Sequence, residues 1–309
     1  MGSRRATDED PDEAFVIAAA SGVTGRLPVG LGIGDDAAIL EGGQVVSTDT
    51  MVEGVHWDQR LEPGDVGWKL VAVNVSDIGA MGGRPRWATL AMALPSPLDR
   101  GWVTAFFEGF AAASRRFGLP LVGGDTTRSP GPRVLTLTVG GHAGAPVRRD
   151  GARAGDDVWV TGELGRAAEA FGSTSPSPSA MAWFRRPEPP ISFGAALAEA
   201  GLAHAMIDVS DGLARDLGRL CRASGVGASV DPALLPGGRP LPDAIAFGED
   251  YELCFAATPG AQSAICSLAS MHGIVVTRVG AFTSTPELRL LGHLGWPPPQ
   301  FDHFVSEPR

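Results

Sequence analysis

The chain has 309 residues, of which 44% are hydrophobic and 19% are charged, so it is long enough for two soluble domains with buried cores. Its net charge of −10 argues against a nucleic-acid-binding protein, which needs a basic surface. Three cysteines without a CxxC pair favour a reducing cytoplasm over a disulfide or zinc framework, and no apolar run reaches the roughly 18–20 residues of a membrane span.

The hydrophobic pattern predicts helices and strands in alternation through the first half of the chain. Helices are expected over residues 12–20, 63–77 and 97–117. Strands are expected over residues 44–47, 87–94, 121–122 and 133–141. We place a domain boundary in the Gly- and Arg-rich segment that follows, which gives one domain over residues 1–145 and another over residues 146–309.

The second half also mixes the two element types. Strands are expected over residues 157–161, 206–207, 252–257, 274–279 and 288–291. Helices are expected directly after Gly165 and over residues 191–200, 212–223 and 261–271. Residues 172–190 are rich in Ser and Pro and are expected to form a loop. Both halves therefore belong to the α/β or α+β class.

Acidic residues come in short segments rich in Gly, Ser and Thr. Six such segments lie at residues 34–37, 47–50, 74–77, 123–127, 208–212 and 248–250. Each puts a carboxylate beside a residue that bends the chain or offers a hydroxyl, and Mg²⁺ takes oxygen ligands of this kind. Any one segment alone is more often ordinary turn chemistry. The six together indicate a phosphoryl-transfer site with several magnesium ions.

Strand ends are where three of these carboxylates are expected. Asp49, Asp125 and Asp208 each follow a short apolar run and precede a predicted turn, a common place for binding groups. Two carboxylates about 4 Å apart repel by about 4 kcal/mol at an effective dielectric constant of about 20, so a cluster needs cations. The chain has no Walker A loop, no protein-kinase HRD or DFG motif and no Rossmann fingerprint. From the residues alone, Arg149 is equally compatible with a solvated linker charge, and His56 is more often structural.

The six segments resemble, in order, those of the thiamine-monophosphate kinase family, over about residues 13–304. The motifs are GIGDDA at residues 32–37, STDTMVEGVH at 47–56, AVNVSDIGAMG at 72–82, GGDTTR at 123–128, IDVSDGL at 207–213 and GEDYEL at 248–253. The resemblance implies a two-domain fold of the aminoimidazole-ribonucleotide-synthetase-like superfamily, with an N-terminal mixed sheet and a C-terminal α/β domain. It also implies a homodimer formed through the N-terminal domains, with the active site between domains and completed at the dimer interface.

The implied reaction converts ATP and thiamine monophosphate to ADP and thiamine diphosphate, the last step of thiamine diphosphate biosynthesis. Transfer is direct and in line, with several Mg²⁺ ions and no catalytic side chain. The implied magnesium ligands are Asp36, Ser47, Thr48, Asp49, Asp77, Asp125, Asp208 and Asp211. The implied ATP contacts are Gly124, Asp125, Arg149 and Ser210. The implied acceptor contacts are His56, Glu249 and Phe301, and Asp35 is the weaker candidate of the Asp35–Asp36 pair.

Two positions depart from the family pattern, because Phe247 stands where a second Gly is frequent and Phe301 where an aromatic with a polar edge is frequent. Selenophosphate synthetases carry a reactive Cys near the N-terminus, whereas the first Cys here is Cys221. The hydrogenase-maturation dehydratase ends in a Cys, whereas this chain ends in Arg309. An aminoimidazole ribonucleotide synthetase-like enzyme and a catalytically silent magnesium- or nucleotide-binding protein stay as alternatives.

Overall fold

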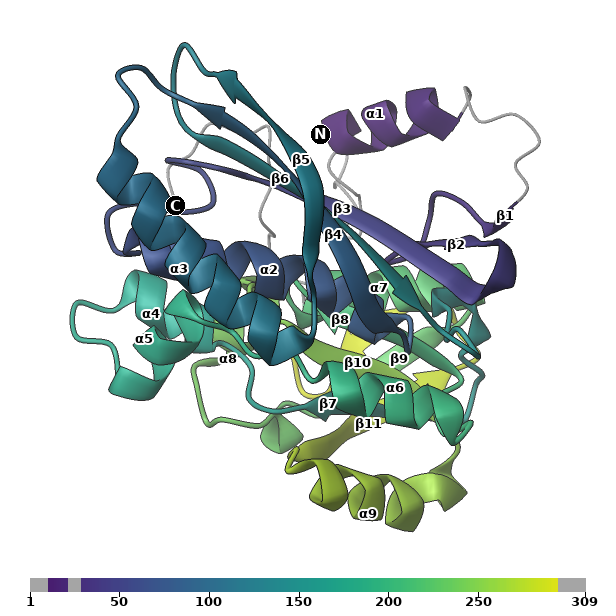
Figure 1. Ribbon diagram of the computed structural model, residues 1–309. Coiled ribbons are helices and arrows are strands. Elements are labelled where there is room, and N and C mark those ends of the chain that lie inside the picture. The colour runs from purple at the N-terminus through teal and green to yellow at the C-terminus, as the bar shows by residue number, and fades with distance from the viewer. Residues whose placement is uncertain (1–10, 22–28, 294–309) are drawn as a thin grey trace.

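The computed structural model describes residues 11–21 and 29–293, which form two mixed sheets with helices packed on them (Figure 1). Phe301 lies outside these residues. Within them, no helix is long and apolar enough to cross a membrane.

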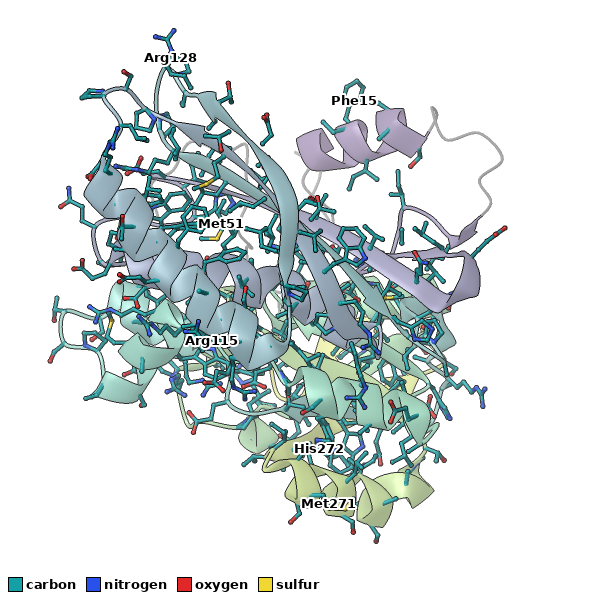
Figure 2. All side chains as sticks on the ribbon, in the orientation of Figure 1. Phe15, Met51, Arg115, Arg128, Met271 and His272 are labelled. Carbon is teal, nitrogen blue, oxygen red and sulfur yellow. The ribbon has the colours of Figure 1, made fainter. Side chains whose placement is uncertain are left out.

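The N-terminal domain contains a six-stranded sheet in the order β1-β2-β3-β6-β4-β5, in which only the β4–β5 pair is parallel. Its strands are β1 (Val29–Leu31), β2 (Ala38–Leu40), β3 (Gln44–Val52), β4 (Arg84–Leu94), β5 (Leu121–Arg128) and β6 (Val134–His142). Its helices are α1 (Pro11–Ser21), α2 (Pro63–Ala80) and α3 (Arg100–Phe117). Figure 2 shows Met51 of β3 within the core of this domain, and Phe15 of α1 on its surface.

The C-terminal domain contains a second six-stranded sheet in the order β12-β9-β11-β7-β10-β8, in which only the β12–β9 pair is parallel. Its strands are β7 (Asp157–Thr161), β8 (Ala205–Val209), β9 (Gly227–Val230), β10 (Glu252–Ala257), β11 (Val276–Thr283) and β12 (Leu288–Leu290). Its helices are α4 (Arg166–Gly172), α5 (Pro178–Arg185), α6 (Ile191–Glu199), α7 (Leu213–Ser224), α8 (Leu241–Ala246) and α9 (Gln262–His272).

Helix α2 joins the two domains, because it packs on β3 and β6 of the first sheet and also contacts β8 and α6 of the second domain. Glycines set how closely α2 approaches α3. A Cβ atom on Gly67 of α2 would lie 2.2 Å from the Phe106 carbonyl oxygen, and one on Gly109 of α3 would lie 1.8 Å from that of Gly64. No larger side chain fits at these positions without moving a helix. Helix α2 is therefore held rigidly, and it carries several residues of the site described below.

Several predicted elements differ from those observed. β3 extends to Val52 and pairs with β6 along its whole length, so Asp49 lies inside a strand and does not end one. Its polar Ser-Thr-Asp-Thr run alternates between the two faces, which is strand geometry and not a turn. β5 likewise runs from Leu121 to Arg128, so Asp125 is also inside a strand, and Asp208 is the fourth residue of β8.

The loop expected over residues 172–190 contains helix α5. Ser177 caps it by accepting a hydrogen bond from the Ala180 N–H at 3.2 Å, and Pro178 follows at the first helical position. Ser before Pro is a helix start signal, which the Ser- and Pro-rich composition of this segment obscured. The helix expected from residue 97 begins at Arg100, because Asp99 caps it by accepting from the Trp102 N–H.

Candidate active site

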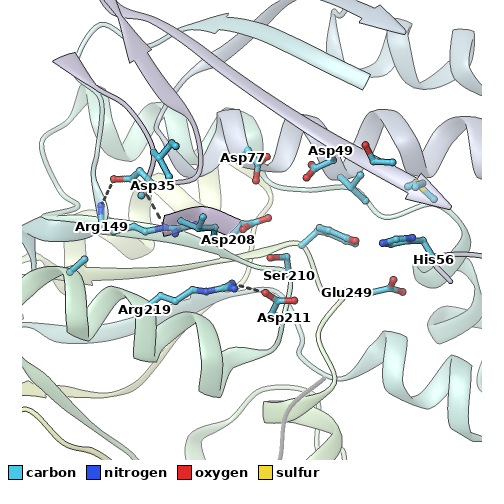
Figure 3. A pocket seen from close by; sticks show the side chains of 18 of the residues that line it. Asp35, Asp49, His56, Asp77, Arg149, Asp208, Ser210, Asp211, Arg219 and Glu249 are labelled. Carbon is cyan, nitrogen blue, oxygen red and sulfur yellow. Dashed lines mark hydrogen bonds and ion pairs between the residues drawn. The ribbon is translucent and has the colours of Figure 1, made fainter. Parts of the chain in front are cut away.

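A cavity of about 720 Å³ lies between the domains, lined from β3, α2, β8, α7 and the turn over residues 248–251 (Figure 3). Most of the residues that the sequence singled out meet here. Those that line it are Asp49, His56, Asp77, Arg149, Asp208, Ser210, Asp211 and Glu249. Figure 3 shows arginines at one end, carboxylates in the middle, and His56 and Glu249 at the other end.

A carboxylate cluster occupies the middle of the cavity. One oxygen each from Asp36, Asp77 and Asp208 lies within 4.8 Å of the others. Asp36 precedes β2, Asp77 lies in the last turn of α2, and Asp208 lies in β8, so the two domains must be assembled for the cluster to form. Ser47 donates to an Asp77 oxygen at 2.5 Å and Ser76 donates to an Asp208 oxygen at 2.7 Å, and these hydroxyls orient the carboxylates.

Burial and mutual repulsion both raise the pKa values of the carboxylates in this cluster. Burial, followed by the charges of neighbouring carboxylates, raises the pKa of Asp77 and of Asp208 well above the usual range. Burial likewise raises the pKa of Asp49 to about 6. Carboxylates held this close are stable as anions only with cations among them. An all-oxygen donor set of carboxylates and hydroxyls fits Mg²⁺, whereas zinc prefers nitrogen and sulfur ligands.

An amide on α2 holds β3 in place beside the cluster. The Asn74 side chain accepts a hydrogen bond from the Asp49 N–H at 3.0 Å and donates one to the Leu70 carbonyl at 2.8 Å. Asn74 is fully buried, so both bonds are shielded from water. The distance between Asp49 on the strand and Asp77 on the helix is thereby set by a direct contact.

Arginines line the opposite end from His56. The Arg149 guanidinium bonds an Asp36 oxygen at 2.6 Å, while its backbone N–H donates to Asp35 at 3.0 Å. Burial and the nearby Asp36 charge raise the pKa of Asp35 to about 6. Arg219 bonds Asp211 at 2.6 Å and the fully buried Asp216 at 2.9 Å. Guanidinium groups at the end of a cavity provide the charge and geometry that bind phosphate.

The other end of the cavity is formed around the GEDY turn. Glu249 and Tyr251 both have left-handed backbone conformations, with φ of 57° and 50°. Such conformations are costly outside glycine and persist where surrounding contacts impose them. Here the Glu249 N–H donates to the Ser210 carbonyl at 2.8 Å and the Tyr251 N–H donates to that of Val209 at 2.9 Å. The Glu249 carboxylate pairs with the Lys69 ammonium at 2.9 Å.

His56 faces the same end from the segment after β3. Its Nδ1 accepts a hydrogen bond from the Val52 N–H at 3.0 Å, which fixes the ring. Phe247 is not among the cavity-lining residues, and its ring packs on Phe171 of α4 at a centroid distance of 5.5 Å. Phe247, which departs from the family pattern, therefore packs beside the turn and does not face the cavity.

Three residues expected in the site do not contribute their side chains to the cavity. The Thr48 side chain bonds the Leu137 carbonyl and the Thr138 hydroxyl, on the sheet face away from Ser47 and Asp49, so it is not oriented as a metal ligand. Gly124 and Asp125 are exposed on the edge strand β5, three strands from β3 and therefore about 14 Å away. Their segment was expected at the end of a strand beside the others, and the strand order separates them.

Lys69, Asn74 and Arg219 are site residues that the sequence reasoning missed. The signal for Lys69 was its spacing, since positions 69, 73 and 77 fall on one face of a helix, and Val73 and Asp77 line the same cavity. Asn74 and Ser76 lie within the motif at residues 72–82 but contain no carboxylate. Arg219 lies two turns into α7 from Asp211, and no local pattern distinguishes it from a surface arginine.

The chain matches two family models. Residues 34–143 match the N-terminal domain of AIR synthase related proteins, and residues 153–293 match the C-terminal domain of the same proteins. It is 38% identical to the thiamine-monophosphate kinase of Salmonella typhimurium, over 85% of this chain and 87% of that protein. Identity to the same enzyme of Bacillus subtilis is 36%, over 73% of this chain and 77% of the relative.

Solved structures are similar as well. The thiamine-monophosphate kinase of Stenotrophomonas maltophilia superposes with a TM-score of 0.75 at 38% identity, over 90% of this chain and 95% of that one. A structure described as AaThiL complexed with AMPPCP and TMP superposes with a TM-score of 0.79 at 27% identity, over 93% and 95% of the two chains. The hydrogenase maturation protein HypE shares the fold alone, at 21% identity and a TM-score of 0.66.

Proposed function

The chain belongs to the thiamine-monophosphate kinase family, and we propose that it transfers the γ-phosphoryl group of ATP to thiamine monophosphate, forming thiamine diphosphate. The observation that carries this proposal is the carboxylate cluster of Asp36, Asp77 and Asp208, placed between an arginine-lined end and an end with Glu249 and His56. That order suits a nucleotide triphosphate on one side and a phosphorylated, cationic acceptor on the other. The AaThiL complex, which holds AMPPCP and TMP, supports the same pair of ligands.

Magnesium fits the residues in the middle of the cavity. Asp36, Asp77 and Asp208 would be the central ligands. Asp49 and Asp211 line the same cavity and Ser47 bonds Asp77, so these three would extend the set to several ions. Bound Mg²⁺ supplies neutralisation of the charge on the transferring phosphoryl group and on the leaving phosphates. The carboxylates hold the ions, the Ser47 and Ser76 hydroxyls orient them, and Arg149 and Ser210 contact the nucleotide.

Direct in-line transfer agrees with the composition of the site. The acceptor phosphate oxygen attacks the γ-phosphorus, the bond from the β-phosphate oxygen breaks, and ADP leaves with that electron pair. Glu249 and His56 bind the acceptor and orient it, and we expect Phe301 to contact it as well. Catalysis then comes from positioning and charge compensation, with no covalent enzyme intermediate.

The exposed edge of the N-terminal sheet supports a homodimer. β5 is exposed along its whole length, and Leu121 and Val122 are 40% and 64% exposed. An edge strand that is exposed along its whole length and begins with two exposed apolar residues is unusual in a monomer. We propose that two N-terminal domains meet here and bring Gly124 and Asp125 to the partner's cavity. Residues 1–145 then bind ATP and magnesium and form the dimer, while residues 146–309 complete both substrate pockets.

The test is the reaction itself. Purified protein with ATP, Mg²⁺ and thiamine monophosphate should form thiamine diphosphate, resolved by chromatography, and thiamine without a phosphate should give none. ATP binding without product, under varied Mg²⁺, would instead support a catalytically silent nucleotide-binding protein. The cysteines Cys221, Cys254 and Cys266 are all unpaired, which supports a cytoplasmic location.

A further inference from the structure

Lys69 is the only lysine among the 25 basic residues of the chain, and all the others are arginine. It is not a surface charge, because only 1% of the residue is exposed. A buried cation is expensive to desolvate and persists where it has a specific partner. The chain thus places its one lysine ammonium group at the cavity, on the face of α2 that also carries Val73 and Asp77.

The contacts of Lys69 connect the two domains at the acceptor end. Its Nζ lies 2.9 Å from a Glu249 oxygen, and it lies over the Phe184 ring of α5 at 4.3 Å from the centroid. Lys69 belongs to the rigid helix α2, whereas Glu249 belongs to a strained turn of the C-terminal domain. The ammonium therefore ties a carboxylate on a turn to a fixed point on a helix.

The turn is held from its other side by α4 and α5. Trp183 donates its indole N–H to the Asp250 carbonyl at 3.0 Å, and the buried Asp250 carboxylate accepts from the Gly165 N–H at 2.9 Å. These bonds fix the backbone of the turn and leave the direction of the Glu249 side chain to its own partners. The ion pair between Glu249 and Lys69 is buried, because only 2% of the Lys69 side chain and 12% of the Glu249 side chain are exposed.

We propose that Lys69 is a positioning residue for the acceptor, acting through Glu249. The ammonium fixes the Glu249 carboxylate at the end of the cavity where a cationic, phosphorylated acceptor binds, and so sets the affinity for that acceptor and not for the nucleotide. An ammonium acts as a compact point charge, whereas an arginine at this position would grip the carboxylate through a two-pronged fork. This inference rests on the proposed function.

A double-mutant cycle tests it. Lys69→Met, Glu249→Gln and the double variant are compared with wild type by their KM for thiamine monophosphate and for ATP. Loss of a hydrogen bond between charged groups corresponds to roughly a tenfold to hundredfold rise in KM. We expect such a rise for thiamine monophosphate in Lys69→Met, with the KM for ATP within about twofold of wild type. The double variant should be no worse than Glu249→Gln alone, and Lys69→Arg should lie between Lys69→Met and wild type.

The matched control is Arg186→Met. Arg186 also pairs with a carboxylate of α2, its Nε lying 2.6 Å from Asp65, but it is outside the cavity, so both KM values should stay unchanged. The double variant has no unpaired buried charge and keeps the test valid if Lys69→Met folds poorly.

Additive effects in the cycle, or an equal rise in both KM values, would assign Lys69 a general structural role and overturn the inference. So would wild-type kinetics in Lys69→Met. If wild-type protein makes no thiamine diphosphate, the proposed function fails and the inference fails with it, whereas an active wild type with unaffected Lys69 variants removes the inference alone.

Discussion

Asp125 gives the sharpest test of how the site is completed. It lies on β5, about 14 Å from β3 across β4 and β6, and this distance is far longer than an aspartate side chain. Asp125 therefore cannot join the cluster around Asp77 of its own chain without rearranging the sheet. If it binds magnesium, as the GGDTTR segment suggests, it acts in the site of the partner. Asp125→Ala should then abolish turnover while the protein stays folded, because the residue is exposed.

Mixing two inactive variants distinguishes the partner's site from its own. In a dimer of Asp125→Ala with Asp77→Ala, the first chain contributes an intact Asp77 and receives an intact Asp125 from the second. Random exchange at equal concentrations makes half of the dimers mixed, each with one complete site, so about one quarter of the wild-type activity should return. Asp77→Ala mixed with Asp208→Ala is the control, since both residues belong to one protomer's cluster and no complete site can form.

The outcome is measured as thiamine diphosphate formed per mole of chain, with the dimer followed by light scattering. No recovery in the first mixture, from variants shown to exchange, would refute the assignment of Asp125 to the partner's site. Near-normal activity of Asp125→Ala alone would show that it is not a metal ligand. A monomer at assay concentrations with full activity would contradict both the dimer and the shared site.

Two further predictions concern stability. Gly67→Ala would place a Cβ 2.2 Å from the Phe106 carbonyl oxygen, and we expect the overpacking to lower the free energy of unfolding by about 1–3 kcal/mol in urea titrations. The control is Gly172→Ala in helix α4, because that position has open space around its Cβ and no left-handed backbone. A destabilisation by Gly172→Ala as large as that by Gly67→Ala would contradict the packing account. In the metal-free protein, the pKa of Asp49 is raised from 3.8 to about 6. Between these pH values the folded state binds more protons than the unfolded state, so the contribution of Asp49 to the free energy of unfolding falls as pH rises through them. Mg²⁺ should flatten this fall, and if the free energy of unfolding of Asp49→Asn has the same slope against pH as wild type, Asp49 is not the source of the fall.

The acidic segments could be recognised from sequence because each combines a carboxylate with a turn or hydroxyl residue within a few positions. Five of the six line the cavity or enter its cluster. The sixth, around Asp125, could not be placed, because its position depends on β5 pairing with β4 at the far edge of the sheet. That pairing is a contact between strands distant in sequence, and local propensity carries no information about it.

The same limit applies within the site. Strand β7 and strand β10 were predicted with their observed bounds, since each is a short apolar run between turn residues. The strand around Asp49 was predicted too short, because strands were recognised by their apolar residues. Its Ser-Thr-Asp-Thr segment places hydroxyl and carboxylate side chains on both faces of the sheet. Lys69 became significant only once the turn bearing Glu249, 180 positions away in sequence, was placed beside it.

Helix α2 carries Lys69 in its first half and Asp77 in its last turn, and the two positions are eight residues apart. At 1.5 Å per residue, this is about 12 Å along a helix that its glycine contacts with α3 hold in place. The helix thus fixes the distance between the Lys69–Glu249 pair and the carboxylate cluster. If the acceptor binds as we propose, its cationic ring and its phosphate must be spaced to reach both ends at once, and the site then selects acceptors by length as well as by charge.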